Sequence, residues 1–445
     1  MTNDEDWSFV LRPSSFVCHA RRLVWARFAL LDAQRFAAPL RRWRGNLAVL
    51  AATAFLRGAR GSMYNVIWQP FVLSLGASMP TLGLLNSIGG MGGIIPTLVQ
   101  PLGGWFADRL GRKPFLIAAS LATISAYTLW VLAGGLNVWL LLLIGVIFAG
   151  LSMLATPAIS SLTAESVRAE RHGSAFSLMA VAGMVPGIVA PALGGWIADR
   201  YSYVIIFAIS LGLEVIVLFL VWRYLRETRP ADASGVSGRE ALRALRRAIV
   251  PPKGLTGFFC ALAADSFSWG MGWGLLYGMI TETYHFSAEQ LGIMSSVMSL
   301  TWAVTQMPIG RYIDRRGTRS MLIFSEVLGI PLMLIWLTQT RFEIFAASQA
   351  LFALTAATWV PTVNTYLTRQ VSAAERAEAF GRLSAFRGLI AFPGPTIGGL
   401  LYAWGGMRAP LLANLAGIFV VIAILVLFVR EPRESGNQVI GESGN

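Results

Sequence analysis

The sequence predicts an all-α integral membrane protein with twelve transmembrane helices in two six-helix bundles. Composition is the first reason: 55% of the 445 residues are hydrophobic and only 13% are charged, whereas about 25% are charged in soluble domains. The second is a series of apolar segments, each long enough to cross a bilayer. The third is a polar stretch at 104–113 that recurs at 310–319 in the other half of the chain. Together they indicate a 6+6 tandem repeat.

A bilayer core of about 30 Å requires roughly 20 apolar residues per helix. The segments that supply them are 46–75, 82–107, 114–133, 138–163, 174–198, 202–224, 254–283, 287–313, 319–338, 342–368, 380–403 and 408–430. The sequence 225–253 is the only long internal linker, and it is polar and basic. It separates an N-terminal bundle at 46–224 from a C-terminal bundle at 254–430. A basic extension at 1–45 and a polar tail at 431–445 flank them.

The positive charges predict the orientation. The two termini and the loops on the same side of the membrane carry 30 arginines and lysines, whereas the loops on the opposite side carry three. Cytoplasmic loops are the ones enriched in these residues, so both termini are expected in the cytoplasm. The net charge of +13 is therefore attributed to membrane orientation and not to nucleic-acid binding. The eight arginines of 1–45 fit either an amphipathic helix on the cytoplasmic leaflet or a poorly ordered tail.

The recurring stretch reads GWFADRLGRK at 104–113 and GRYIDRRGTR at 310–319. An aspartate there can accept hydrogen bonds from free amides at a neighbouring helix N-terminus, and a glycine allows the tight turn. The candidate latch residues are Gly104, Asp108, Arg109, Gly111, Arg112 and Lys113 in the first copy, and Gly310, Asp314, Arg315 and Gly317 in the second. A basic turn that serves only membrane orientation is the alternative.

These hairpins, in a twelve-helix chain, resemble the signature loops of the major facilitator superfamily over residues 46–430. The resemblance implies two bundles that rock about a central cavity, a monomer, and hairpins that latch the cytoplasmic side of the outward-open state. It also implies that helices one, four, seven and ten line the cavity. Segments five and eleven both resemble the antiporter motif of the family. In segment five, Ala190 replaces the first glycine of the motif, whereas segment eleven keeps it. The motif positions are Pro191, Gly194, Gly195, Gly394, Pro395, Gly398 and Gly399; close helix packing and helix bending follow from these residue types.

Ionisable residues within membrane helices are functional candidates. Arg57 and Arg60 lie on segment one, and Asp265 lies on segment seven at a similar depth. We expect Arg57 and Asp265 to face the cavity and to interact when it closes, so that protonation of Asp265 couples protons to transport. A static pair, or Asp265 bonded to a neighbouring serine, is the alternative. Arg387 on segment eleven is expected to pair across the bundles or to extend to the cytoplasmic face.

Two acids and two aromatic stripes complete the candidate residues. Glu214 and Glu326, on segments six and nine, are assigned packing or gating roles. The stripes fall on segments one and seven at helical spacing, and they comprise Tyr64, Trp68 and Gln69 and then Trp269, Trp273 and Tyr277. We expect them to line a cavity for apolar molecules or aromatic cations; a position facing lipid is the alternative.

The predicted function is secondary transport, with export of small lipophilic molecules in exchange for protons across the plasma membrane (the cell inner membrane). Proton-coupled uptake of a sugar or organic anion is the rival, and Arg57 and Arg60 favour it. A membrane receptor or a lipid-handling protein is the alternative outside transport. No nucleophile–base pair, phosphate-binding loop or metal-ligand spacing is found in the sequence. We therefore expect no enzyme activity, cofactor, metal or nucleic-acid partner.

Overall fold

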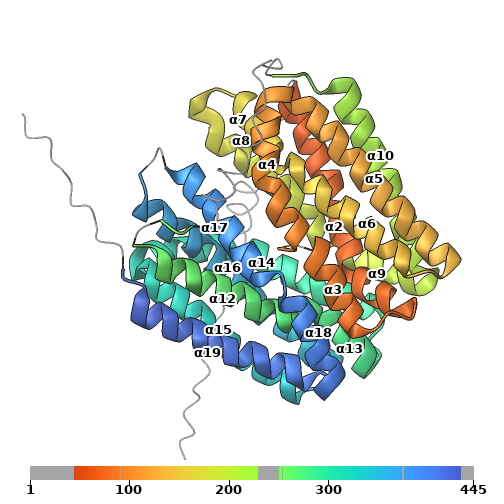
Figure 1. Ribbon diagram of the computed structural model, residues 1–445, viewed down its shortest axis with the longest axis vertical. Helices are drawn as coiled ribbons and strands as arrows, with labels where there is room; N and C mark the ends of the chain where they lie inside the picture. Colours follow the sequence, from red (N-terminus) through yellow and green to blue (C-terminus); the bar gives the residue numbers. More distant parts are fainter. Residues whose placement is uncertain (1–44, 91, 229–249, 253, 373–374, 432–445) are drawn as a thin grey trace, which may run out of the picture.

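The computed structural model describes residues 45–90, 92–228, 250–252, 254–372 and 375–431. All regular elements in these ranges are helices. Figure 1 shows two bundles, one made of the red to yellow-green helices and one of the green to blue helices. Each of the twelve expected segments coincides with helical structure. The expectations for 1–44, for 229–249 of the linker and for 432–445 of the tail lie outside the described residues.

The first bundle follows the six expected segments in order. Its helices are α2 (Asn46–Ser74), α3 (Met79–Gly89), α4 (Ile94–Leu110), α5 (Arg112–Leu136), α6 (Leu140–Leu151), η1 (Ser152–Ala155), α7 (Thr156–Glu165), η2 (Ala169–Arg171), α8 (His172–Met184), η3 (Val185–Ile188), α9 (Ala190–Arg200) and α10 (Tyr203–Tyr224). Buried aromatic side chains of α2, α5 and α10 form much of its core, among them Phe71, Tyr127 and Phe207.

The second bundle repeats this order. Its helices are α12 (Thr256–Met271), η4 (Trp273–Leu275), α13 (Leu276–Tyr284), α14 (Ala288–Arg316), α15 (Thr318–Thr338), α16 (Phe342–Gln370), α17 (Arg376–Ala391), α18 (Gly394–Gly405) and α19 (Arg408–Phe428). The bundles meet where α9 packs on α14 and where α18 packs on α3.

Contacts between helix ends define two sides of the molecule. On one side the Asn46 side chain exchanges hydrogen bonds of 2.8 Å with the backbone of Arg226, and Tyr366 donates to the carbonyl of Arg430. We call this the linker side, because the chain leaves α10 and enters α12 there. The opposite side, where α5, α9, α13 and α18 have their C-terminal ends, is called the far side.

Several of the expected long helices are interrupted at mid-height, where glycine and proline occur. The second segment breaks between α3 and α4 in a glycine-rich stretch, and Gly92 there has φ of 83°. The fifth breaks at η3, which contains Pro186, and the eleventh breaks at Pro393. Proline removes a backbone donor and clashes with the preceding turn. In membrane proteins irregular backbone is tolerated where it borders a cavity or packed protein, so these breaks direct attention to the middle of the molecule.

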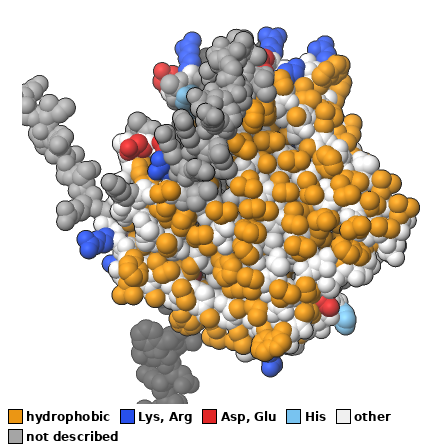
Figure 2. Space-filling view, in the orientation of Figure 1, with side chains coloured by type: hydrophobic (Ala, Val, Ile, Leu, Met, Phe, Trp, Pro, Cys, Tyr) orange, Lys and Arg blue, Asp and Glu red, His pale blue; other side chains and the backbone are white. Residues whose placement is uncertain are grey.

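The surface fits a lipid environment. Figure 2 shows hydrophobic side chains over most of one face, while lysines and arginines gather at its edges. Exposed apolar residues such as Trp222, Met307 and Leu427 would make a soluble protein aggregate. Within the described residues, eight helical stretches are long and apolar enough to cross a membrane. The other expected spans, at 46–74, 256–284, 288–316 and 376–405, are helical but carry charges or interruptions.

Candidate functional site

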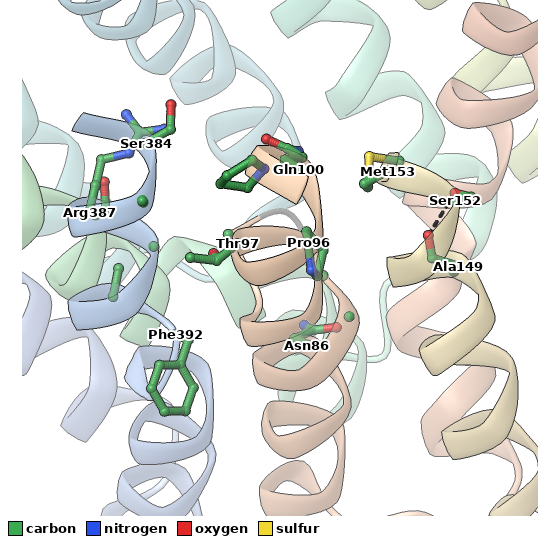
Figure 3. Close-up of a pocket in the computed structure, with 18 of the residues that line it drawn as sticks. Asn86, Pro96, Thr97, Gln100, Ala149, Ser152, Met153, Ser384, Arg387 and Phe392 are labelled. Atoms are coloured by element: carbon green, nitrogen blue, oxygen red, sulfur yellow. Dashed lines mark hydrogen bonds between the residues drawn. The ribbon is translucent and has the colours of Figure 1, made fainter. Parts of the chain in front are cut away.

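A cavity of about 1100 Å³ lies between the bundles and reaches the linker side. At mid-height it is bounded by Trp130 and Pro395, and at the linker side by Glu378 and Arg382, which are paired with each other. In the view of Figure 3, α4 stands between α17 and the segment α6–η1. The polar and flexible side chains at this wall include Asn86, Thr97, Gln100, Ser152, Met153, Ser384 and Arg387. The helix breaks at Gly90, Ser152 and Phe392 also line it.

The far side is closed by direct contacts between the bundles. Gln69 donates to the carbonyl of Gly274 at 3.0 Å and accepts from the amide of Gly278 at 2.7 Å. Ser87 bonds both the amide and the hydroxyl of Thr396, at 3.1 and 2.7 Å. The cavity is therefore sealed from the far side in this conformation.

The first bundle holds a buried charged cluster beside the cavity. Glu214 on α10 lies 3.6 Å from the Arg57 guanidinium and 3.4 Å from that of Arg60, and its side chain is 1% exposed. Arg57 also donates to the Ser120 hydroxyl at 3.1 Å. Arg60 lies over the ring of Tyr127, 5.0 Å from the centroid, and it lines the cavity. Two cations thus share one anion, and Arg60 is the member that faces the cavity.

The second bundle holds the opposite combination of two acids and one base. The carboxyl groups of Asp265 on α12 and Glu326 on α15 lie close enough to interact, and Arg387 lies close enough to attract the Asp265 carboxylate. Ser266 donates to Asp265 at 3.5 Å. Both acids are buried, at 8% and 1% exposure, while Arg387 lines the cavity. Two buried carboxyl groups this close favour a state with a proton on one of them, because two ionised carboxylates would repel each other.

The expected pairing of Arg57 with Asp265 is absent from this conformation. Each residue finds its partners within its own bundle: Arg57 at Glu214 and Ser120, and Asp265 at Glu326. Matching the two halves gave the depth of each residue along its helix but not the direction in which its side chain points. Glu326 and Ser120 are themselves equivalent positions, 206 residues apart. Glu214 and Glu326, for which the sequence predicts packing or gating roles, thus provide these partners.

The aromatic stripes are only partly at the cavity. Tyr64 lines it, together with Tyr127 and Trp130, and stacks on Trp130 at 5.7 Å. Trp68 is buried and donates to Asn86 at 2.8 Å. In the second bundle, three of the predicted residues lie off the cavity wall: Trp269 and Trp273 pack on Phe352, and Tyr277 lies near Ser295. The far-side closure explains the difference, because it packs this part of α2 against η4 and α13. α16, the expected tenth helix, supplies no residue to the wall.

The predicted hairpins occupy the linker side. Gly111 and Gly317 adopt φ of 91° and 85°, a conformation that favours glycine and permits each turn. The side chains of Asp108, Arg109 and Asp314, and the surroundings of Gly104, lie outside the described residues. Arg315 is exposed, and a side chain added at Gly310 would meet open space.

Two glutamates that follow the sixth and twelfth segments cap the first turns of α5 and α15. Glu227 accepts from the amides of Arg112 and Lys113 at 3.0 and 2.9 Å. Glu431 accepts from the amides of Thr318 and Arg319 at 2.6 and 2.8 Å. The sequence assigned such amide bonds to Asp108. The match of Glu227 with Glu431, 204 residues apart, was the signal that could have identified these capping residues.

Replacing Glu227 with glutamine is expected to destabilise the start of α5. The substitution removes one carboxylate oxygen and the favourable charge at a helix N-terminus, a loss of about 1 kcal/mol. Hydrogen exchange at the amides of Arg112 and Lys113 should become faster by roughly fivefold, since 1.4 kcal/mol corresponds to tenfold. Glu431→Gln is the matched variant and should accelerate Thr318 and Arg319 instead. Unchanged exchange at Arg112 and Lys113 would contradict the capping role.

The glycines of the antiporter-like motifs allow close helix contacts. A Cβ atom at Gly195 would lie 2.1 Å from the carbonyl oxygen of Ala288, and one at Gly399 would lie 2.4 Å from that of Met79. Both contacts join the two bundles at the far side. A Cβ atom at Gly194, Gly394 or Gly398 would instead crowd the same bundle, at Met63, Phe267 and Met271 respectively. Pro191 and Pro395 lie in the first turns of α9 and α18, where proline is accommodated.

No group of three or more histidine, cysteine, aspartate or glutamate side chains that could hold a metal ion occurs in the part of the chain that the structure describes. What the site offers is a large cavity, three arginines at its wall, of which Arg382 is paired with Glu378, and a carboxyl pair behind Arg387. This arrangement suits binding and proton exchange.

Comparisons with known proteins agree with this arrangement. The family model of the Major Facilitator Superfamily matches residues 50–268 and 258–444. Multidrug resistance protein MdtG of Serratia proteamaculans (strain 568) is 26% identical over 404 residues, which are 87% of this chain and 92% of that protein. A crystal structure of a D-xylose-proton symporter covers 87% of this chain and 98% of its own, with a TM-score of 0.65 and 16% identity. That of the human organic anion transporter MFSD10 has a TM-score of 0.59 and 18% identity, and covers 85% and 98%.

The two structures show the fold alone, whereas the family match spans nearly the whole of both bundles. Members of this family move small molecules across membranes and are not enzymes. The chain belongs to the major facilitator superfamily and is a multi-pass membrane transporter.

Proposed function

We propose that this protein exports small lipophilic molecules in exchange for protons, by alternating access. The observation that carries the proposal is the cavity, closed on the far side and open on the linker side, with the Asp265–Glu326 carboxyl pair directly behind its wall. The cavity is large enough for drug-sized molecules, and the pair provides a buried place for a proton. The relative from Serratia is named a multidrug resistance protein, which supports the export of such molecules.

The orientation follows from the charges. All twelve helical segments cross the plasma membrane, with the linker side and both termini in the cytoplasm, because 30 arginines and lysines fall on that side against three on the other. The structure then corresponds to an inward-open state in which the cavity is reached from the cytoplasm. The protein works as a monomer, since each bundle pair encloses its own cavity.

Charge balance determines which protonation states of the Asp265–Glu326 pair occur during transport. With one proton on the Asp265–Glu326 pair, its remaining negative charge is balanced by Arg387. A second proton leaves Arg387 without an anion, and the guanidinium is then free to face the cavity. Loss of both protons would bury two anions against one cation, which is costly in a membrane. The pair therefore alternates between one and two protons during transport.

A second candidate function is proton-coupled uptake of an organic anion. The specific observation in its favour is that Arg60 and Arg387 both line the cavity, and arginine recognises carboxylate and phosphate groups well. In this case the second proton and the anion would enter together, because protonation releases Arg387 to bind the anion.

Purified protein in liposomes with a trapped pH-sensitive dye distinguishes these functions. The buffers contain no sodium and have equal pH on both sides, and the probe is added outside. Entry of a quaternary lipophilic cation by antiport should raise the internal pH, whereas entry of a sulfonate or sugar with protons should lower it. A protonophore should abolish either change. Acidification by the sulfonate alone would overturn the export proposal, and protein-free liposomes give the background.

A further inference from the structure

Asp199, at the far end of α9, holds the first turn of α14 in the opposite bundle. Its carboxylate accepts from the amides of Ala288 and Glu289 at 3.0 and 2.7 Å. Ser287 and Gln290 satisfy the neighbouring amides through a capping box. The four amides at 287–290, which lack partners within the helix, are thus all bonded, and two of them depend on a side chain from the other bundle.

The surrounding backbone is packed tightly enough to fix this contact. A Cβ atom at Gly195 would lie 2.1 Å from the Ala288 carbonyl oxygen, and one at Gly292 would lie 2.5 Å from that of Pro191. α9 and α14 therefore approach each other along a full helical turn beside Asp199. Opening the far side must separate these two helices and break both bonds.

The sequence around Asp199 repeats that around Asp108. Residues 102–109 read LGGWFADR and residues 193–200 read LGGWIADR, so seven of eight positions are identical. The first copy ends α4 on the linker side and the second ends α9 on the far side. Segments with this relation belong to an inverted repeat of three helices within the bundle.

The packing of the two copies agrees with an inverted repeat. A Cβ atom at Gly103 would lie 2.1 Å from the carbonyl oxygen of Leu154 in the fourth segment, and one at Gly194 would lie 3.1 Å from Met63 in the first segment. In a repeat of three helices the fourth segment is the counterpart of the first. Equivalent glycines therefore contact equivalent helices of their own bundle.

The other far-side junction, between α18 and α3, has no such carboxylate. The position equivalent to Asp199 is Ala403, 204 residues later, and the position equivalent to Glu289 is Pro80, 209 residues earlier. Proline has no amide hydrogen, so both the acceptor and one donor are missing together. The far side therefore has one carboxylate clamp, on the α9–α14 junction.

We propose that Asp199 is the far-side latch of the transport cycle, the inverted counterpart of the linker-side latch that the family resemblance assigns to Asp108. Capping α14 across the interface stabilises the state in which the far side is closed, because charge-assisted bonds to helix amides are strong. The proposal requires alternating access but neither the proposed substrate nor proton coupling.

The test measures the far-side distance directly in full-length protein in lipid nanodiscs. Cys18 and Cys260 are replaced by serine, and spin labels are placed at Leu136 and Thr340, exposed far-side residues of the two bundles. A second labelled pair at Arg168 and Arg376 reports the linker side. Pulsed electron spin resonance then gives the populations of open and closed forms on each side.

Asp199→Asn should lower the ratio of far-side-closed to far-side-open molecules by about tenfold, because the amide group turns a donor toward helix donors. Asp108→Asn, the same change in the linker-side copy, should not open the far side. Glu343→Gln removes an exposed far-side carboxylate whose recorded ion pair is with Arg341, and it should leave both distances unchanged.

A second variant acts on the other partner of the bond. Glu289→Pro deletes one donor and imitates Pro80, so the helix start should be retained. It should also open the far side, and combining it with Asp199→Asn should add less than the sum of the single effects. Wild-type distances in both single variants, or fully additive effects, would overturn the latch. Since the distance measurement involves no transport, it can support or overturn the latch even if the proposed export function is wrong.

Discussion

Glu214→Gln is expected to lower the thermal stability of this protein more than any other single change of charge in the first bundle. Arg57 and Arg60 share Glu214 as their recorded acidic partner, and their side chains are only 21% and 15% exposed. Removing the anion leaves two nearby cations buried together. Breaking a buried ion pair in this way costs about 3 kcal/mol or more.

The measurement is the apparent unfolding temperature of the detergent-solubilised protein, followed by a thiol-independent probe such as intrinsic fluorescence. A loss of about 3 kcal/mol predicts a fall of roughly 5 to 10 °C. Glu343→Gln, which removes an exposed carboxylate at the far side, is the control and should change the temperature by less than about 1 °C.

A double variant separates charge from packing. If unbalanced charge is the cause, adding Arg57→Gln to Glu214→Gln should recover part of the lost stability, because one buried cation is removed. A further fall in the double variant would mean that the Arg57 side chain matters through its packing. An unfolding temperature equal to that of the wild type in Glu214→Gln would contradict the charge-balance argument altogether.

The sequence was sufficient to predict the positions of the helical segments and the duplication of the chain, because the length of an apolar segment and a repeated glycine motif are both local signals. It also predicted a similar depth for Arg57 and Asp265 in the two bundles, since helical rise converts position into depth. It could not give the rotation of α2 about its axis. That rotation turns Arg57 toward Ser120 and Glu214, and it depends on how α2, α5 and α10 pack.

Glu214 and Glu326 show a second limit of the sequence, because their partners were not predicted. Both lie on segments six and nine, which are not among the helices that the family resemblance assigns to the cavity, and both were assigned packing or gating roles. Burial of an acid in an apolar helix requires a partner, and each bundle contains another charged residue that could serve as one: Arg57 or Arg60 in the first and Asp265 or Arg387 in the second. Applying that requirement to each bundle separately would have led to Glu214–Arg57 and to Asp265–Glu326 from the sequence.

Asp199 was missed because the search for repeats used one spacing. Tandem duplication gives offsets of 204 to 209, whereas the copy at 193–200 lies 91 residues after 102–109. An inverted repeat places its copies on opposite sides of the membrane, so positive-inside counting assigned Arg200 to an outer loop without connecting it to Arg109. The contact with α14 is what reveals the relation.

Asp265→Asn and Glu326→Gln are each expected to abolish proton-coupled transport while leaving substrate exchange intact. Either variant leaves a single carboxyl group, and the nearby Arg387 favours its ionised form, so we expect it no longer to take up and release the coupling proton. The remaining carboxylate stays balanced by Arg387, and the protein should fold. Substrate-driven pH change in liposomes should then fall to the level of protein-free liposomes.

Exchange of labelled for unlabelled substrate provides the decisive comparison, because it requires binding and rocking of the bundles but no net proton movement. It should continue in both variants at a rate within about threefold of the wild type, which corresponds to less than 1 kcal/mol. Glu343→Gln should retain both activities. Proton-coupled transport that persists in Asp265→Asn and Glu326→Gln would place the coupling proton elsewhere. Loss of exchange together with coupling would mean that the pair maintains the structure of the cavity and does not carry the proton.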